Sequence, residues 1–193
     1  MSHIMYQVTL RLEHSEPPVW RTLQVLNTTS LEDLHDMFQV AMGWQNEQAY
    51  QFIIDDHYYG DDDLGSSGSR SDASTVRLGD LIKRGKVSFM YEYDLSDGWE
   101  HHVHVDKIRP VSAEEAARLP LCTAGENACP PEECGGIFGY YELLSLLKDP
   151  AHPAYAEMVE QYGVIDPRAF DLSAVNQNLK NLFQPVSTSA RGS

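Results

Sequence analysis

Basic residues are scarce in this chain. It has 14 lysines and arginines against 29 aspartates and glutamates among its 193 residues, which gives a formal net charge of −15. Nucleic-acid binding needs clustered basic side chains that release counterions from the phosphates, and no stretch of this sequence supplies them. A serine recombinase would also need a basic DNA-binding region. The composition therefore excludes nucleic acid as a partner and a resolvase activity, and it favours either simple solubility or attraction to a basic partner.

Long apolar runs and phosphate-binding loops are also lacking. No run reaches the roughly 18 apolar residues of a membrane-spanning helix, and no apolar signal core precedes the first strand pattern. Neither the G-x-x-x-x-G-K-[ST] nor the G-x-G-x-x-G pattern occurs. We therefore expect a cytoplasmic protein that does not interact with a membrane.

What is present describes a globular protein, since 42% of the residues are hydrophobic and 10% are aromatic. We expect a single α+β domain over residues 5–185, with a sheet-rich part at 5–110 and a helical part at 111–185. Residues 1–4 and 186–193 are expected to be a tag or disordered tails.

Alternating apolar and polar residues predict strands in the first part of the chain. A hairpin is expected at 5–28, two short strands at 49–61 and a second hairpin at 86–111. Between the first two, the stretch 29–44 has helical spacing, with Ser30 as its N-cap and Gly43 at its end. The fold class is therefore α+β, a mixed or antiparallel sheet with one helix on its face and a β-grasp-like opening.

The last part of the chain has the composition of helices. A short helix is expected after Ser112, with Glu115 in the capping-box position. Three further helices are expected at 139–150, 154–163 and 171–183, separated by proline and glycine, so that the C-terminal third is helical.

Two further expectations concern the loop and the core. The acidic run Asp61–Asp63 fails the EF-hand template, because glycine and glutamate are missing at the required positions, and it is interpreted as a solvated loop. The predicted core residues lie on the apolar faces of the expected elements: Trp20, Leu34, Phe38, Phe52, Phe89, Tyr91 and Leu143.

The three cysteines, Cys122, Cys129 and Cys134, lie close together in the segment CTAGENACPPEECGG. Their spacing lacks the Cys-x2-Cys knuckle of structural zinc sites, but His101 could supply a fourth ligand to a Cys3His zinc site. The alternatives are reduced thiols buried under a rigid Pro/Gly turn, or a redox-active pair. Because disulfides are disfavoured in the cytoplasm, we prefer reduced thiols and expect no cofactor, with zinc as the possible exception. We also expect this segment to pack against the hairpin at 87–107.

That hairpin carries the other candidate site. Trp99 and His101 share one face of the second strand, and Glu100 and His102 share the other. An acidic and aromatic binding surface is predicted at the hairpin from these residues: Asp94, Asp97, Trp99, Glu100 and His102. No nucleophile accompanies them, so no catalytic residue is assigned.

Several stretches agree with one known family. They read PPVWRTLQVLNTTSLEDLHDMFQVAMGW, YEYDLSDGWEHHVHVDKI, CTAGENACPPEECGGIFGYYELL and FDLSAVNQNL. They resemble the plasmid pRiA ORF-three-like family over residues 5–183. The resemblance implies a compact α+β protein with no established activity. The chain departs from the family pattern at Tyr50, where a histidine is frequent, and at Ser96–Trp99, which replaces Gly-Asp-Ser-Trp.

The function that the sequence favours is a non-catalytic binding or interaction module with an unknown protein partner. Its expected working surface combines the hairpin at 94–104 with the turn at 122–136. The alternative is a small metal-dependent, zinc-type hydrolase that uses Cys and His ligands with a nearby carboxylate.

Overall fold

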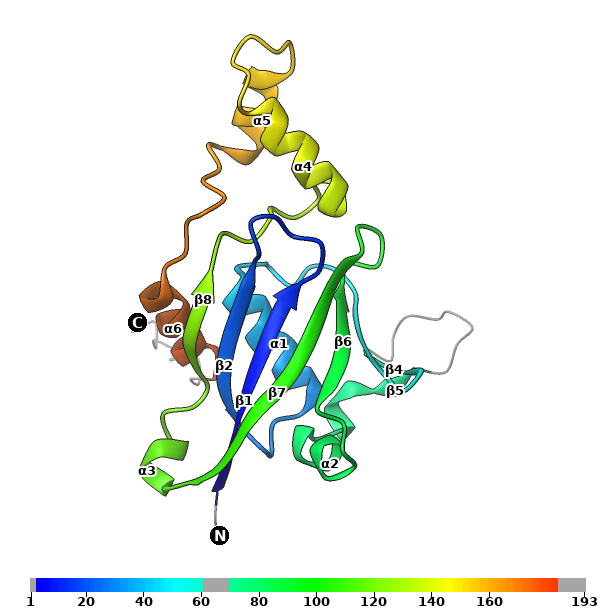
Figure 1. Cartoon of the computed structure of the whole chain (residues 1–193), viewed down its shortest axis with the longest axis vertical. Coiled ribbons are helices and arrows are strands. Elements are labelled where there is room, and N and C mark those ends of the chain that lie inside the picture. The colour runs from blue at the N-terminus through cyan, green and yellow to red at the C-terminus, as the bar shows by residue number, and fades with distance from the viewer. Residues whose placement is uncertain (1–2, 61–69, 184–193) are drawn as a thin grey trace, which may run out of the picture.

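A computed structural model describes residues 3–60 and 70–183 and contains an eight-stranded sheet (Figure 1). The strands are β1 (His3–Leu12), β2 (Trp20–Leu26), β3 (Tyr50–Ile54), β4 (His57–Gly60), β5 (Ser71–Asp72), β6 (Ser88–Tyr93), β7 (Trp99–Val111) and β8 (Leu121–Glu126). Their order is β5-β4-β3-β6-β7-β1-β2-β8. The β4–β5 pair is parallel and the other pairs are antiparallel, so the predicted mixed α+β class is confirmed.

Six α-helices and a 3-10 turn accompany this sheet in the described residues. They are α1 (Leu31–Met42), the 3-10 turn η1 (Ala73–Thr75), α2 (Leu78–Lys83), α3 (Ala113–Ala116), α4 (Gly136–Leu146), α5 (Tyr155–Tyr162) and α6 (Leu172–Leu182). Helix α1 lies behind the sheet in Figure 1, and α4 and α5 project beyond one end of it. No helix in the described part of the chain combines the length and apolar character needed to cross a bilayer.

Two details of the predicted architecture differ from the structure. The part at 111–185, expected to be helical, also contains a strand, because β8 pairs with β2 and completes the sheet. Helix α1 is not alone, because α6 packs against both α1 and β8. Strand β8 escaped prediction because its segment LCTAGE has a weak apolar alternation, and its pairing depends on a strand about a hundred residues earlier in the sequence.

The ends of the expected domain are also placed differently. His3 and Ile4, which were expected in an N-terminal tail, lie in β1 opposite Val111 and Pro110 of β7. The acidic run Asp61–Asp63 and the expected C-terminal tail at 186–193 lie outside the described residues.

Helix α1 has the ends that the sequence predicts. The Ser30 hydroxyl accepts a hydrogen bond from the Asp33 amide at 3.0 Å, and the Asp33 carboxylate accepts one from the Ser30 amide at 3.4 Å. Gly43 ends the helix with φ at 97°, a left-handed conformation that glycine adopts without a steric penalty. The helix is therefore fixed at both ends by local chemistry.

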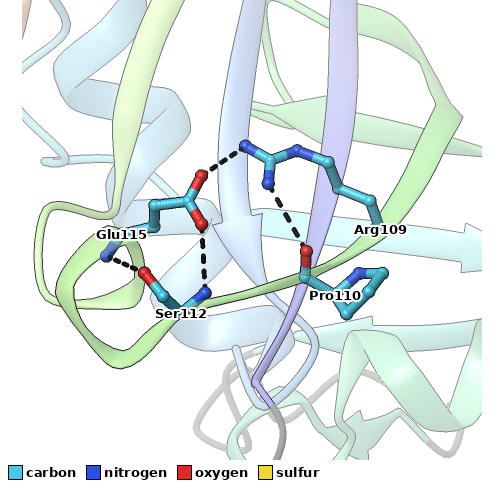
Figure 2. Close-up of polar contacts among 4 residues, drawn as sticks. All are labelled: Arg109, Pro110, Ser112 and Glu115. Atoms are coloured by element: carbon cyan, nitrogen blue, oxygen red, sulfur yellow. Dashed lines mark hydrogen bonds and ion pairs between the residues drawn. The ribbon is translucent and has the colours of Figure 1, made fainter.

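Helix α3 repeats this arrangement at the end of β7 (Figure 2). Ser112 and Glu115 form the predicted capping box, with hydrogen bonds of 3.0 and 3.1 Å. Arg109 adds an ion pair of 3.0 Å to the same glutamate. This ion pair ties α3 back to the strand that precedes it.

The core lies between the sheet and α1. Leu34, Phe38, Phe52, Phe89 and Tyr91 are buried in it, as predicted. Two predicted members differ. Leu143 is buried on α4 but lies outside the main core cluster, and Trp20 is only half-buried. The Trp20 indole points to the edge of the sheet and donates a hydrogen bond to Glu126 at 3.1 Å, because Arg21, not Trp20, shares the buried face of β2 with Leu23.

Strand β8 is the last strand of the sheet, and a side chain of α6 covers part of its free edge. The Asn176 side-chain carbonyl accepts a hydrogen bond from the Cys122 amide at 2.8 Å, and its NH2 group donates one to the Cys122 carbonyl at 2.8 Å. The side-chain amide thus takes the place that a neighbouring strand would occupy. Exposed strand edges can pair with other chains, so this contact also blocks such pairing.

Replacing Asn176 with leucine is expected to lower the free energy of unfolding by about 1–3 kcal/mol, because both backbone groups of Cys122 lose their partner. Urea unfolding measures the change. The matched control is Asn178→Leu on the same helix, since the Asn178 side chain is exposed and forms no hydrogen bond with a described residue. Equal losses in the two variants would contradict this role of Asn176.

Candidate functional site

The cysteine segment crosses the end of the sheet between β8 and α4. The Gly135 amide donates a hydrogen bond to the Asp97 carboxylate at 3.1 Å. Gly136 has φ at 70°, and a Cβ at this position would collide with the Asp97 carbonyl oxygen, so only glycine fits there. The prediction that this segment packs against the hairpin at 87–107 is therefore confirmed.

Glu132 holds the middle of the segment in place. Its carboxylate accepts a hydrogen bond from the Tyr93 hydroxyl at 2.6 Å and another from the Gln45 amide at 3.0 Å. Burial, together with the hydrogen bond to Glu132, raises the pKa of Tyr93 well above its usual value, so the phenol keeps the proton that it donates. The Trp44 indole donates a further hydrogen bond to the Pro130 carbonyl at 3.0 Å. The segment is thus fastened to the chain that follows α1.

Arg21 of β2 fixes the beginning of the segment. Its side chain is only 2% exposed, and its nitrogens donate to four backbone carbonyls within 2.7–2.9 Å. These carbonyls belong to Trp20, Ala41, Glu126 and Asn127. The Phe170 ring lies over the guanidinium, 4.3 Å from ring centre to Cζ. No carboxylate of the described residues lies within ion-pair distance, so carbonyl dipoles and an aromatic face stabilise this buried charge.

The three cysteines are free thiols. Cys122 is buried on β8, whereas Cys129 and Cys134 are half-buried and pack against the core. Burial raises the pKa of all three thiols, and it raises that of Cys134 to about 12. Thiols with such pKa values stay protonated near neutral pH and are poor nucleophiles.

His101 lies among aromatic rings. It is fully buried, with its ring 5.3 Å from those of Trp44 and Tyr91, and burial lowers its pKa to about 4. Within residues 3–60 and 70–183, no three His, Cys, Asp or Glu side chains are grouped so that they could hold a metal ion. The structure therefore does not bring Cys122, Cys129, Cys134 and His101 together as the zinc hypothesis requires.

The predicted binding surface on the hairpin is divided between the two faces of the sheet. Trp99 is buried with its ring 5.8 Å from that of Trp44, whereas Glu100 and His102 are exposed on the opposite face. Asp94 is also buried, and its carboxylate accepts hydrogen bonds from the backbone of the turn at residues 96 and 97. Asp97 is half-buried under Gly135. The five residues thus shape the hairpin and do not share one surface.

A cleft of about 710 Å³ opens beside the cysteine segment, and we call it the acidic cleft. The end of α1, the segment 128–133 and the chain between α5 and α6 form its walls. Its charged lining residues are Arg21, Glu47, Glu132, Glu133 and Asp171, and its aromatic lining residues are Trp44, Tyr162 and Phe170. Arg21 lies buried at its wall, so the charge that the cleft presents to solvent is negative.

Sequence reasoning found one wall of this cleft and missed the others. The segment 128–133 belongs to the predicted working surface, but the three aromatic residues come from distant parts of the chain. Trp44, directly after the predicted helix end at Gly43, was the available signal, because tryptophan is highly buried on average and its N–H group then finds a partner.

Comparisons with known proteins identify one family and two similar proteins. The family model described as plasmid pRiA4b ORF-3-like protein matches residues 4–176. The uncharacterised protein y4hQ of Sinorhizobium fredii (strain NBRC 101917 / NGR234) is 35% identical over 188 residues, which cover 96% of this chain and 95% of y4hQ. The crystal structure of MM3350, a protein of unknown function from Methanosarcina mazei Go1, is similar with a TM-score of 0.76 and 30% identity, over 89% of this chain and 97% of that one.

Proposed function

The chain belongs to the plasmid pRiA4b ORF-3-like family, and from this premise we propose that it is a non-catalytic binding module. The acidic cleft receives a cationic segment of a protein partner. Binding takes place in the cytoplasm, where the thiols beside the cleft stay reduced, and it involves neither nucleic acid nor a membrane. The relatives named above are uncharacterised or of unknown function, so the proposal depends on the cleft itself.

The charge of the cleft is the observation that carries the proposal. Four carboxylates line it, and its basic lining residue, Arg21, already donates to four carbonyls. Glu47 and Glu133 are exposed, and their carboxylates form no hydrogen bond or ion pair with a described residue. An arginine or lysine of a partner can therefore pair with them, and the net charge of −15 would speed its approach.

The shape of the cleft supports the same proposal. A volume of about 710 Å³ lies in the range of ligand sites, and the aromatic face of Tyr162 can stack on a guanidinium. Glu132 is held by Tyr93 and Gln45, so its position is set before a ligand arrives. A pre-positioned site loses less conformational entropy on binding.

No specific observation favours the alternative of a zinc-type hydrolase. Its proposed ligands are not grouped in the described residues, and the thiols are in surroundings that keep them protonated. A binding module remains the function that the geometry supports best.

A short peptide of alternating arginine and serine tests the proposal by isothermal titration calorimetry. We expect it to bind, and we expect Glu47→Gln/Glu133→Gln to weaken binding roughly tenfold, equivalent to about 1.4 kcal/mol. The control variant is Glu157→Gln on α5, which changes an exposed glutamate that does not line the cleft. The control peptide carries citrulline in place of arginine, which removes the charge and keeps the shape. Equal binding of the two peptides would contradict the proposal.

A further inference from the structure

A second hollow lies between α6, α3 and the beginning of β8. It consists of a pocket of about 930 Å³ and an adjoining one of about 610 Å³. Leu119, Pro120 and Phe183 line both pockets, so the two form one continuous groove, which we call the α6 groove. None of its lining residues belongs to the acidic cleft.

Three exposed apolar side chains gather in the α6 groove. Leu121, Leu172 and Phe183 are 37%, 37% and 47% exposed, and they are three of the eight large hydrophobic residues that the described chain exposes. Leu179 forms part of the floor and is buried. Clustered exposed apolar side chains mark binding sites, whereas scattered ones need no explanation.

Basic side chains border this apolar surface, in contrast to the rest of the molecule. Four of the 14 lysines and arginines line the groove, together with two aspartates, Asp33 and Asp80. The four are Arg77, Lys83, Arg118 and Lys180. In a chain with a net charge of −15, this local excess of positive charge selects for an anion.

Two of the four cations have no carboxylate partner among the described residues. Lys83 pairs with Asp80 and Arg118 pairs with Glu114, whereas Arg77 donates only to the Thr28 carbonyl. Lys180 is exposed on α6 and forms no ion pair with a described residue. Lys180 is one of the residues that line the larger pocket.

We propose that the α6 groove binds a single-chain amphipathic anion, a long-chain fatty carboxylate. The hydrocarbon chain covers Leu121, Leu172 and Phe183, and the carboxylate pairs with Lys180. A pocket lined mainly by apolar side chains, with a few polar or charged groups, is the usual form of a small-molecule site. The ten residues after Phe183 are a poor match for the groove, since they carry one arginine and no acidic side chain.

Titration of the full chain with dodecanoate below its micelle concentration tests this proposal. We expect saturable binding by calorimetry, with Lys180→Glu weakening it roughly tenfold because a like charge then faces the carboxylate. Phe183→Ser, which shortens the apolar wall, is expected to weaken binding as well. The matched control is Lys148→Glu, an exposed lysine after α4 that lines neither pocket and should leave binding unchanged.

Two further ligands separate this site from other causes of binding. Dodecyltrimethylammonium carries a similar chain with the opposite charge, and equally tight binding of this cation would overturn the proposal. The proposal would also be overturned if Lys148→Glu weakened dodecanoate binding as much as Lys180→Glu does. An acidic amphipathic peptide that displaces dodecanoate at lower concentration would identify a protein partner instead and would also overturn it. Retention of dodecanoate binding in a chain ending at Phe183 is expected and would rule out a site made by the last ten residues.

Discussion

Lowering the pH from about 7.5 to about 5 will reduce the free energy of unfolding by about 4 kcal/mol, because two buried histidines gain protons when the chain unfolds. His35 and His101 have pKa values of about 4 in the folded protein against 6.5 for an exposed histidine. Below pH 6.5 the unfolded chain binds more protons than the folded one, so stability falls as the pH falls towards 4. At pH 5 each histidine contributes about 2 kcal/mol to this loss.

Burial is the main cause of both shifts, and the contacts of each ring show why a second proton does not fit. The Tyr91 hydroxyl accepts a hydrogen bond from the Gln39 side chain at 2.9 Å, so its own proton points to Nδ1 of His35 at 2.8 Å. Nε2 of His35 donates to the Asn46 side-chain carbonyl at 2.6 Å. Protonation of Nδ1 would therefore place two donors against each other.

A second proton is unfavourable on His101 for a different reason. Its Nδ1 lies 3.3 Å from the Tyr91 carbonyl and donates to it, and its Nε2 is buried without a partner in the described structure. Protonation would leave a charged N–H group among the rings of Trp44 and Tyr91.

Chemical denaturation at several pH values measures this effect. His35→Gln and His101→Leu should each remove about half of the pH dependence, whatever they do to stability at pH 7.5. His102→Gln is the matched control, because His102 is adjacent in sequence but exposed on the other face of β7. A pH dependence that is unchanged in both buried-histidine variants would refute this explanation.

Replacing Arg21 with methionine is expected to lower the free energy of unfolding by about 3–5 kcal/mol, because three carbonyls of other segments lose a hydrogen-bond donor at about 1–3 kcal/mol each. Methionine fills part of the volume but donates no hydrogen bond, so the carbonyls of Ala41, Glu126 and Asn127 lose the group that joins them. The loss should also loosen the wall of the acidic cleft, because Phe170 loses the guanidinium on which it lies.

A lysine at position 21 should rescue little of this stability, since its single ammonium cannot reach carbonyls that a planar guanidinium contacts in several directions. Arg11→Met on the neighbouring strand β1 is the surface control and should change stability by less than about 0.5 kcal/mol, because Arg11 is exposed. Thermal and urea unfolding give both values. If Arg11→Met and Arg21→Met lowered the free energy of unfolding by similar amounts, the buried contacts of Arg21 would not contribute to stability.

Local chemistry explains which features the sequence predicts correctly. Ser30, Gly43 and Ser112 mark helix ends through contacts with residues three or four positions away, and all three behave as expected. The alternation along β7 also places Trp99 and His101 on the buried face. Such features need no knowledge of the rest of the fold.

Features that depend on distant segments could not be predicted in this way. An arginine in an alternating strand is normally taken for a solvent-facing residue. Arg21 is buried because it donates to the carbonyls of residues 126 and 127, and its own neighbours in sequence do not reveal these contacts. Trp20 is expected in the core because a large aromatic residue in a strand is normally taken for a buried one, yet it is only half-buried. The acidic cleft likewise needs Tyr162 and Phe170, which reach it only after the chain has passed through α4 and α5.

The position of β1 inside the sheet has a consequence for synthesis on the ribosome. Strand β1 is made first, yet it lies between β2 and β7, and residues 7 and 8 of β1 pair with 107 and 105 of β7. At roughly 5–20 residues per second, β7 follows β2 by several seconds. During that time both outer edges of the hairpin of β1 and β2 are unpaired, because β8, the other neighbour of β2, is made after β7. Pairing over such a separation also slows folding, so these edges stay open to pairing with other chains until β7 and β8 arrive.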